Sequence, residues 1–321
     1  MTRSLLTHLA VVLGAATLVG ACASNSNSNP GSGGSGGMSS SGGSGSGSGG
    51  SGSGGSGSGG NSGTGGKMLG ANCLSTKDDL IADFKEDNGI YPVDGREGGF
   101  YTYGDDSEKS GDPLAVLDPA EGTTPGIDTA NGNDECSGPG SLHVKGTGFK
   151  VWGAALGTNF APPDPQDSTL KGWYDASKYK GISFWIKAAS ELKNVQVSFP
   201  DVYTDGGANA THVDPSDTER CVYGVQSDNC SPFLVKFGDP DYPNYMDTKV
   251  DTTWRRIDIM FADTKQDKNN PPGYLLPAPD HIDLQHLTAM AIQVNALHDD
   301  ATMSVIANDF EVWVDDMYFI K

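Results

Sequence analysis

Apolar and polar residues alternate in many short stretches along most of the chain, the pattern that half-buried β-strands produce. In the stretch GISFWIKA, Ile182, Phe184 and Ile186 fall on one face of a strand, whereas Ser183 and Trp185 fall on the other. Such strands offer one face to a core and the other to water. Ten segments are predicted to be strands: 79–84, 99–104, 141–146, 150–156, 181–188, 194–199, 233–237, 254–261, 290–296 and 310–320.

Helical periodicity is scarce, and clusters of Gly, Pro and Asp separate the predicted strands. Ten short strands with almost no helix predict an all-β fold, a two-sheet antiparallel sandwich or a barrel. Two of the connections, 105–134 and 201–229, are long. Loops of this length within a compact domain are often functional.

The closing segment FEVWVDDMYFI places two acidic residues, Asp315 and Asp316, side by side within a strand. Because side chains alternate between the two faces, one of them should point the same way as Val312 and Val314, toward the core. Asp is depleted from strands, and a buried carboxylate without compensation is costly. The pair therefore predicts a partner group that compensates buried negative charge.

The N-terminus has the features of a bacterial export signal. Arg3 precedes an apolar stretch that is too short to be a membrane span, and small residues lead to Cys22. The tetrad VGAC is similar to a lipobox, which predicts that residues 1–22 are a lipoprotein signal peptide and that Cys22 is lipidated. An ordinary secretory peptide with an incidental cysteine is the alternative. Ala23, where an acid could stand, favours the outer membrane or cell surface.

Residues 23–66 are almost entirely Gly, Ser and Asn, which predicts a disordered tether, and residues 67–321 form the folded domain. All 41 acidic residues and all but one of the 21 basic residues follow the tether, and the chain carries a formal net charge of -20. Such a domain is unsuited to nucleic acid or to anionic membrane surfaces, so the lipid is the expected membrane contact. The excess of carboxylates suits a hard cation such as calcium.

Four cysteines remain when Cys22 is set aside. An even number in an exported protein favours two disulfides, and the preferred pairs are Cys221 with Cys230 and Cys73 with Cys136. A zinc site is the alternative, but the sequence contains no Cys-x-x-Cys and no His-Glu-x-x-His.

The order of several segments resembles the jelly-roll carbohydrate-binding modules of family 11 and related galactose-binding-like domains. These segments are LIADFKEDNG, SGPGSLHVKG, YKGISFWIKA, TTWRRIDIMF and FEVWVDDMYFI. The resemblance covers most of residues 78–321, and it implies a jelly roll that binds polysaccharide or oligosaccharide.

The resemblance also implies a structural calcium ion between the first and last strands. Carried onto this chain, the expected ligands are Asp315, Asp316, Glu86, Asp134 and Glu135. Calcium takes six to eight oxygen ligands and removes the cost of holding carboxylates together. The alternative is that one aspartate faces water while the other takes backbone donors or a lysine.

Sugars are bound by aromatic rings that stack on their apolar faces and by amides, Arg and Asp that bond their hydroxyls. Outward positions on the predicted strands supply eight candidates, of which about half should share one site: Tyr101, Tyr103, Trp152, Trp185, Gln196, Arg256, Asp258 and Gln293. Packing beneath a long loop is the alternative for each aromatic residue.

Three functions are compatible with these features. The first is a non-catalytic, surface-tethered lipoprotein that binds polysaccharide. The second is a structural or adhesive surface protein without sugar binding, and the third is a polysaccharide-degrading enzyme. Catalysis is not expected, because residues 67–321 have no Gly-x-Ser-x-Gly elbow and no metal-hydrolase helix, and a carboxylate pair among 41 acids discriminates nothing.

Overall fold

The computed structural model describes residues 78–85, 88–110, 113–133, 138, 140–205, 207–208, 231–267, 281–298, 305–306 and 308–321. The following predicted features lie outside these residues: the signal peptide and tether of 1–66, the metal ligands Glu86, Asp134 and Glu135, and Cys22, Cys73, Cys136, Cys221 and Cys230.

Two six-stranded antiparallel sheets make up the domain. The first, sheet 1, contains, in spatial order, β3 (Val116–Asp118), β4 (Leu142–Phe149), β14 (Asn308–Ile320), β6 (Gly181–Ala188) and β9 (Arg255–Met260), with β1 (Leu80–Ala82) paired to β14. The second, sheet 2, contains β10 (Lys265–Gln266), β8 (Phe233–Lys236), β7 (Val195–Phe199), β11 (Ala289–Asn295), β5 (Gly153–Asn159) and β2 (Phe100–Gly104). A separate ladder joins β12 (Leu297–His298) to β13 (Val305–Ile306).

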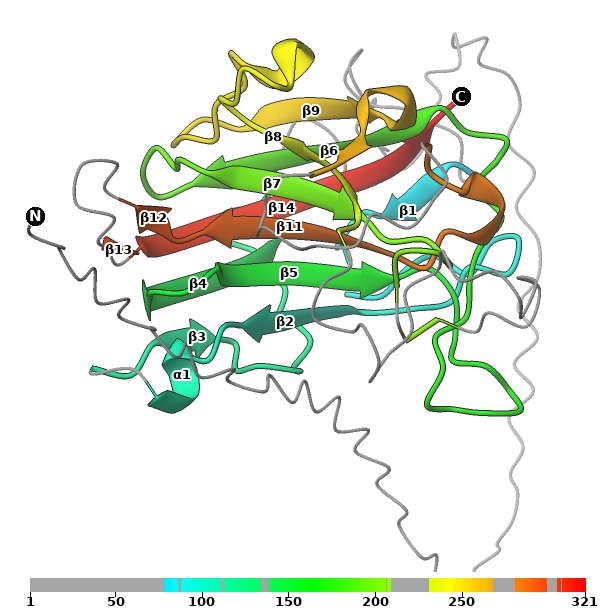
Figure 1. Ribbon diagram of the computed structural model, residues 1–321, viewed down its shortest axis with the longest axis horizontal. Helices are drawn as coiled ribbons and strands as arrows, with labels where there is room; N and C mark the ends of the chain where they lie inside the picture. Colours follow the sequence, from blue (N-terminus) through cyan, green and yellow to red (C-terminus); the bar gives the residue numbers. More distant parts are fainter. Residues whose placement is uncertain are drawn as a thin grey trace, which may run out of the picture. The chain divides into compact units, whose positions relative to one another are not determined.

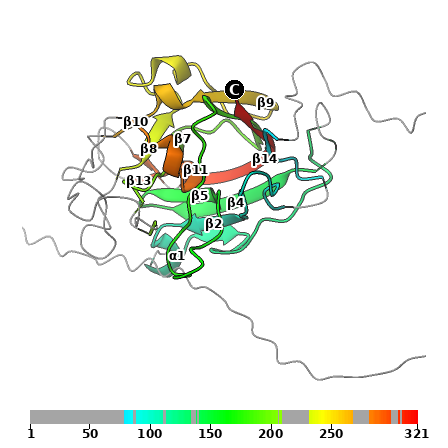
Figure 2. The same cartoon turned by 90° about the vertical axis from the view of Figure 1, so that its right-hand side faces the viewer.

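The two sheets form two layers, with β7, β11, β5 and β2 in front of β6, β14 and β4 in Figure 1 and the same separation visible in Figure 2. The chain passes from sheet to sheet between β4 and β5, β5 and β6, and β6 and β7, as it does in jelly rolls. The predicted all-β, two-sheet antiparallel sandwich is confirmed.

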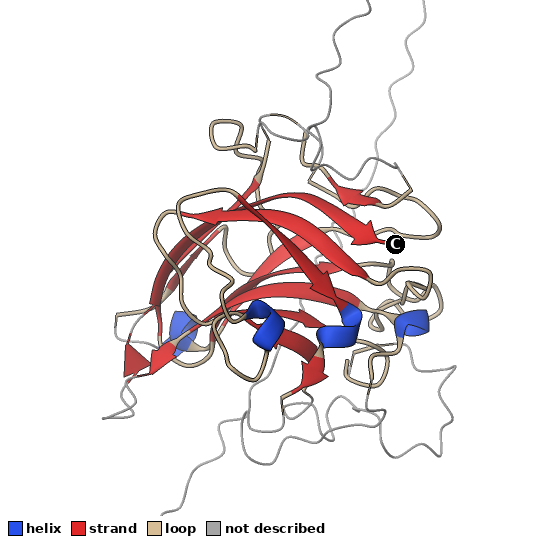
Figure 3. Cartoon of the chain, turned by 90° about the horizontal axis from the view of Figure 1, so that it is seen from above, coloured by secondary structure: helices blue, strands red, loops and turns tan. Residues whose placement is uncertain are grey.

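Helical structure is limited to single turns in the described part of the chain, drawn in blue in Figure 3. These turns are α1 (Ser107–Ser110), η2 (Pro243–Tyr245), η3 (Phe261–Asp263) and η4 (Leu284–His286). Within this part no helix has the length and apolar character needed to cross a bilayer.

The hydrophobic core lies between the two sheets and contains Ile182, Phe184 and Val197, each 0% exposed. The outer row of β7 is shielded as well, because Gln196 is 7% and Ser198 5% exposed. The expectation that each outer face meets water is therefore wrong for β7. Its polar side chains can be buried because they hydrogen-bond, as Gln196 does to Asn295.

A β-bulge in β14 interrupts the strand alternation at the two late aspartates. Asp315 is opposite Trp185 and Tyr318 is opposite Ser183, so β14 contains one more residue than β6 between these two pairs. Asp316 takes up the extra residue with a left-handed φ of 46°. Val314 and Met317 both belong to the core, and the aspartates lie between them. The bulge therefore interrupts the alternation on which the expected direction of the two aspartates rests.

Candidate functional site

One row of side chains crosses the outer face of sheet 2 from β2 to β8. Cross-strand pairing places Tyr103 beside Ala155, Ala155 beside Gln293, Gln293 beside Gln196, and Gln196 beside Lys236. Paired residues point to the same side of a sheet, so five strands contribute to one continuous line. An aromatic ring stands at one end of this line and amides lie along its middle.

The neighbouring row is built mainly from small residues. Tyr101 pairs with Gly157, Gly157 with Ala291, and Ala291 with Ser198. A Cβ atom on Gly157 would lie 2.9 Å from Cζ of Tyr101 and 3.0 Å from Cε1 of Tyr103, so both rings lean over this glycine. Gly157 therefore makes room for the two rings on the surface of the sheet.

Three aromatic rings form a continuous surface along this edge. The centroids of Tyr101 and Tyr103 are 5.8 Å apart, and those of Tyr103 and Trp152 are 5.7 Å apart. All three side chains are half-buried. We call the surface formed by Tyr101, Tyr103, Trp152, Gln196 and Gln293 the tyrosine face.

Hydrogen bonds hold the amides of the tyrosine face in place. Gln293 Nε2 donates to Asn295 Oδ1, and Asn295 Nδ2 donates to Gln196 Oε1 over 3.2 Å. A linked amide network of this kind fixes the direction of its donors and acceptors, of which those of Gln293 and Asn295 are less buried than those of Gln196.

A buried aspartate organises the turn that carries Trp152. Asp105 is 2% exposed, and its Oδ2 atom accepts hydrogen bonds from the backbone N–H groups of Val151, Trp152 and Gly153 at 2.8, 2.9 and 2.8 Å. Its Oδ1 atom accepts from the N–H of Ser107 at 2.8 Å. These bonds fix the 151–153 turn, which in turn holds Trp152 against Tyr103.

An ion pair lies beside the two tyrosines. Lys171 Nζ is 3.0 Å from Asp205 Oδ2, which also accepts from the hydroxyl of Thr288 at 3.0 Å. The Asp205 carboxylate raises the pKa of Lys171, and the two tyrosine hydroxyls add to this rise. Burial raises the pKa of Tyr103 above its ordinary value, and Tyr101 contributes further. The Tyr103 phenol therefore remains neutral beside a paired, charged lysine at neutral pH.

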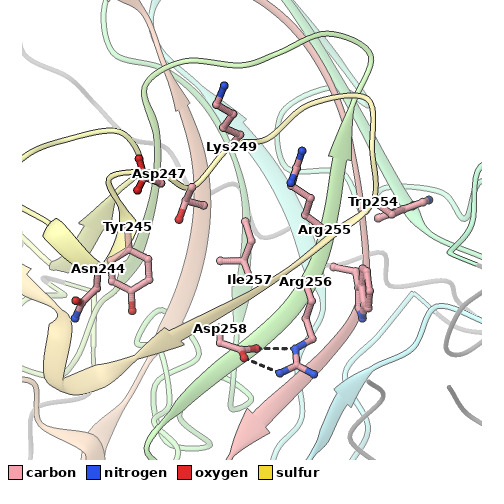
Figure 4. Close-up of a pocket in the computed structure, with 11 residues that line it drawn as sticks. Asn244, Tyr245, Asp247, Lys249, Trp254, Arg255, Arg256, Ile257 and Asp258 are labelled. Atoms are coloured by element: carbon pink, nitrogen blue, oxygen red, sulfur yellow. Dashed lines mark hydrogen bonds and ion pairs between the residues drawn. The ribbon is translucent and has the colours of Figure 1, made fainter. Parts of the chain in front are cut away.

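The eight predicted ligand residues divide between the two sheets. Five of them form the tyrosine face, whereas Trp185 on β6 and Arg256 and Asp258 on β9 belong to sheet 1. These three line a pocket on the other layer, together with residues of the segment that precedes β9 (Figure 4).

The late aspartates lie where the first and last strands meet. Asp315 and Asp316 are both 0% exposed, and Asp83, which follows β1, is 7% exposed. Asp315 Oδ2 accepts from the N–H of Asn133 at 3.1 Å, and the Tyr318 hydroxyl donates to Asp316 Oδ1 at 3.3 Å. Burial raises the pKa of Tyr318, and the charges of Asp316, Asp83 and Asp315 raise it further. Three carboxylates thus act on one hydroxyl group.

The donor chemistry at this junction suits a hard cation, since calcium prefers carboxylate oxygens. Among the residues that the structure describes, no group of three His, Cys, Asp or Glu side chains is arranged to hold a metal ion. Two of the predicted ligand regions directly follow residues whose contacts the structure describes. Asn133, whose N–H donates to Asp315, precedes Asp134. Lys85, which pairs with Asp83 at 3.3 Å, precedes Glu86.

Four residues near these sites were not predicted from the sequence. Asp105, Lys171 and Asp205 lie in connections, where no strand pattern distinguishes one polar residue from the next. Asp83 carried a usable signal, because it is an acidic residue within the first predicted strand, as Asp315 and Asp316 are within the last.

No protein-family model matches the chain, and no curated protein matches it. Among solved structures, a family 11 carbohydrate-binding module from Clostridium thermocellum in complex with a β-1,3-1,4-mixed-linked tetrasaccharide is similar. It shares 16% identity over 75% of this chain and 94% of that chain, with a TM-score of 0.38.

A family 30 carbohydrate-binding module of a Clostridium thermocellum cellulosomal cellulase shares 15% identity, over 63% of this chain and 84% of that chain, with a TM-score of 0.35. SGBP-B from a xyloglucan utilization locus in Bacteroides uniformis shares 10% identity over 76% of this chain and 50% of that chain, with a TM-score of 0.30. Since these values are low, function is inferred from the residues of this chain.

Replacing Asp105 with Ala should destabilise the protein, because three backbone N–H groups of the 151–153 turn lose their common acceptor. We expect the free energy of unfolding in urea to fall by about 2–4 kcal/mol. Asp106→Ala, at the half-buried neighbouring position, is the matched control and should change it by about 0.5 kcal/mol or less. Equal effects of the two substitutions would contradict the role given to Asp105.

Proposed function

We propose that this protein binds polysaccharide through the tyrosine face and does not cleave it. The observation that carries the proposal is the register of sheet 2, which lines up Tyr103, Gln293 and Gln196 on one outer face. Pyranose rings have apolar faces that stack on aromatic rings, while their hydroxyls need both donors and acceptors.

The charges near the tyrosine face also favour a sugar. Lys171 is paired with Asp205 and Lys236 with Asp267, so the cations near the row are balanced by carboxylates. A neutral surface rich in donors and acceptors suits hydroxyl groups better than it suits a charged macromolecule. The chain's net charge of -20 further disfavours polyanions.

We propose further that Cys22 is lipidated and that residues 23–66 tether the binding domain at the bacterial outer membrane or cell surface. The lipobox-like VGAC and the Gly- and Ser-rich composition that follows it support this placement. A tether of this kind would let the domain reach a polysaccharide at some distance from the membrane.

A structural calcium ion is the second part of the proposal. Asp315 and Asp316 would supply carboxylate oxygens, joined by Asp83 and by the predicted Glu86, Asp134 and Glu135. The three described carboxylates around Tyr318 support it, since a divalent cation stabilises such a cluster. Bound there, the ion would hold β1 and the bulge of β14 together.

The binding proposal is tested by electrophoresis through gels that contain β-glucan, xylan, mannan or agarose. The wild-type protein should be retarded by at least one of them. Tyr103→Ala should raise Kd about tenfold or more, because a buried aromatic ring contributes on the order of 1.5–3 kcal/mol. Tyr103→Phe keeps the ring and should retain most of the affinity, and Leu114→Ala removes an exposed apolar side chain elsewhere as a control.

Two results would contradict this function. If none of the polymers retards the wild-type protein, the structural or adhesive alternative is favoured. If the retarding polymer gains reducing ends on incubation with the protein, the enzyme alternative is favoured.

Removing calcium should lower the melting temperature by several degrees, since a ligand present at about 100 times its Kd adds about 2.7 kcal/mol. Calorimetry with calcium and with a chelator measures this difference. Asp315→Ala should abolish it, whereas Asp309→Ala, an exposed position on the same strand, should preserve it. A wild-type melting temperature that does not respond to the chelator would contradict the calcium site.

A further inference from the structure

A pocket lined by aromatic and charged side chains lies on the opposite layer of the sandwich. This pocket of about 440 Å³ opens at β9, the edge strand of sheet 1, between that strand and the segment 244–249 (Figure 4). Trp185 of the neighbouring strand β6 also lines it. The pocket shares no residue with the tyrosine face.

An arginine and an aspartate on the same face of β9 form the polar part of this pocket. Arg256 Nε donates to Asp258 Oδ1 at 3.0 Å and Arg256 Nη2 donates to Asp258 Oδ2 at 2.7 Å. The hydroxyl of Ser183 donates to Asp258 Oδ1 at 2.6 Å. Burial opposes ionisation of Asp258, but the hydrogen bonds from Arg256 and Ser183 outweigh it and lower its pKa. The pair is therefore a fixed, charge-balanced set of donors and acceptors.

Two indole rings supply the apolar part. Trp185 is 7% exposed and is opposite Arg256 in the sheet, so it lies beside the ion pair. Trp254 is half-buried directly before β9, and the Lys187 ammonium lies 5.1 Å from the centre of its ring. The pocket thus combines apolar ring surface with directional polar groups.

The charges in the pocket argue against an anionic ligand. Arg255 Nη2 is 2.7 Å from Asp251, Arg256 Nη2 is 2.7 Å from Asp258, and Lys249 Nζ is 3.7 Å from Glu191. Each cation that lines the pocket therefore has a carboxylate beside it. A ligand with many hydroxyl groups and an apolar ring face suits this surface better than a phosphate or a carboxylate does.

We propose that this pocket is a second carbohydrate-binding site, which takes a sugar unit of the same polysaccharide that the tyrosine face binds. The inference rests on the proposed function. The two sites lie on different sheets with the hydrophobic core between them, so both can be occupied at once. One molecule would then hold two polysaccharide chains, or two parts of one chain, with a gain in overall affinity for the polymer.

The test is a calorimetric titration of the full protein with a tetrasaccharide of whichever polymer retards it in the gels. Wild type should bind two equivalents. Tyr103→Ala should leave one equivalent, and Trp254→Ala or Arg256→Ala should leave the other. Lys145→Ala removes one positive charge from an exposed position on sheet 1 outside the pocket, and it should leave both equivalents.

The outcomes separate this inference from the proposed function. Two equivalents that respond separately to the substitutions support the second site. One equivalent that Tyr103→Ala abolishes and Trp254→Ala leaves unchanged would overturn the second site but retain the tyrosine face. No retardation by any of the polymers would overturn the proposed function and the second site with it.

Discussion

Hydrogen bonding of β14 to three other strands is the interaction on which the rest of this structure depends. β14 is the last strand of the chain, yet it lies in the middle of sheet 1, between β4 and β6, and it also pairs with β1. Its Val312 and Val314 contribute to the core against which sheet 2 packs. Because these pairings join distant parts of the chain, sheet 1 cannot be completed until the C-terminal residues are in place.

Sheet 2 uses the support of this core to present a candidate binding surface on its outer face. Residues that alternate with its core positions form the tyrosine face, and Gly157 provides room for two rings. On sheet 1 the same alternation places Arg256 and Asp258 outward on β9. One core therefore supports two candidate binding surfaces, and each consists of aromatic rings beside charge-balanced or amide groups.

Local pattern was sufficient to predict the fold class, because alternation reports which strand positions are buried. It could not predict the bulge at Asp316, since periodicity assumes an unbroken pleat. The eight ligand candidates came from outward positions, but outward positions exist on both sheets. Only the long-range strand order assigns Gln293 to the tyrosine face and Arg256 to the pocket. Lys171 and Asp205 lie in connections that carry no periodic signal, so their pairing depends entirely on tertiary structure.

The central claim is that the outer face of sheet 2 contacts polysaccharide. It is tested most directly by NMR of the isotope-labelled protein during titration with oligosaccharides from a polymer that it binds. The account predicts that the tyrosine-face signals of β2, β7 and β11, including the side-chain amides of Gln196 and Gln293, shift progressively with added sugar. Binding that leaves all of these signals unchanged would contradict it.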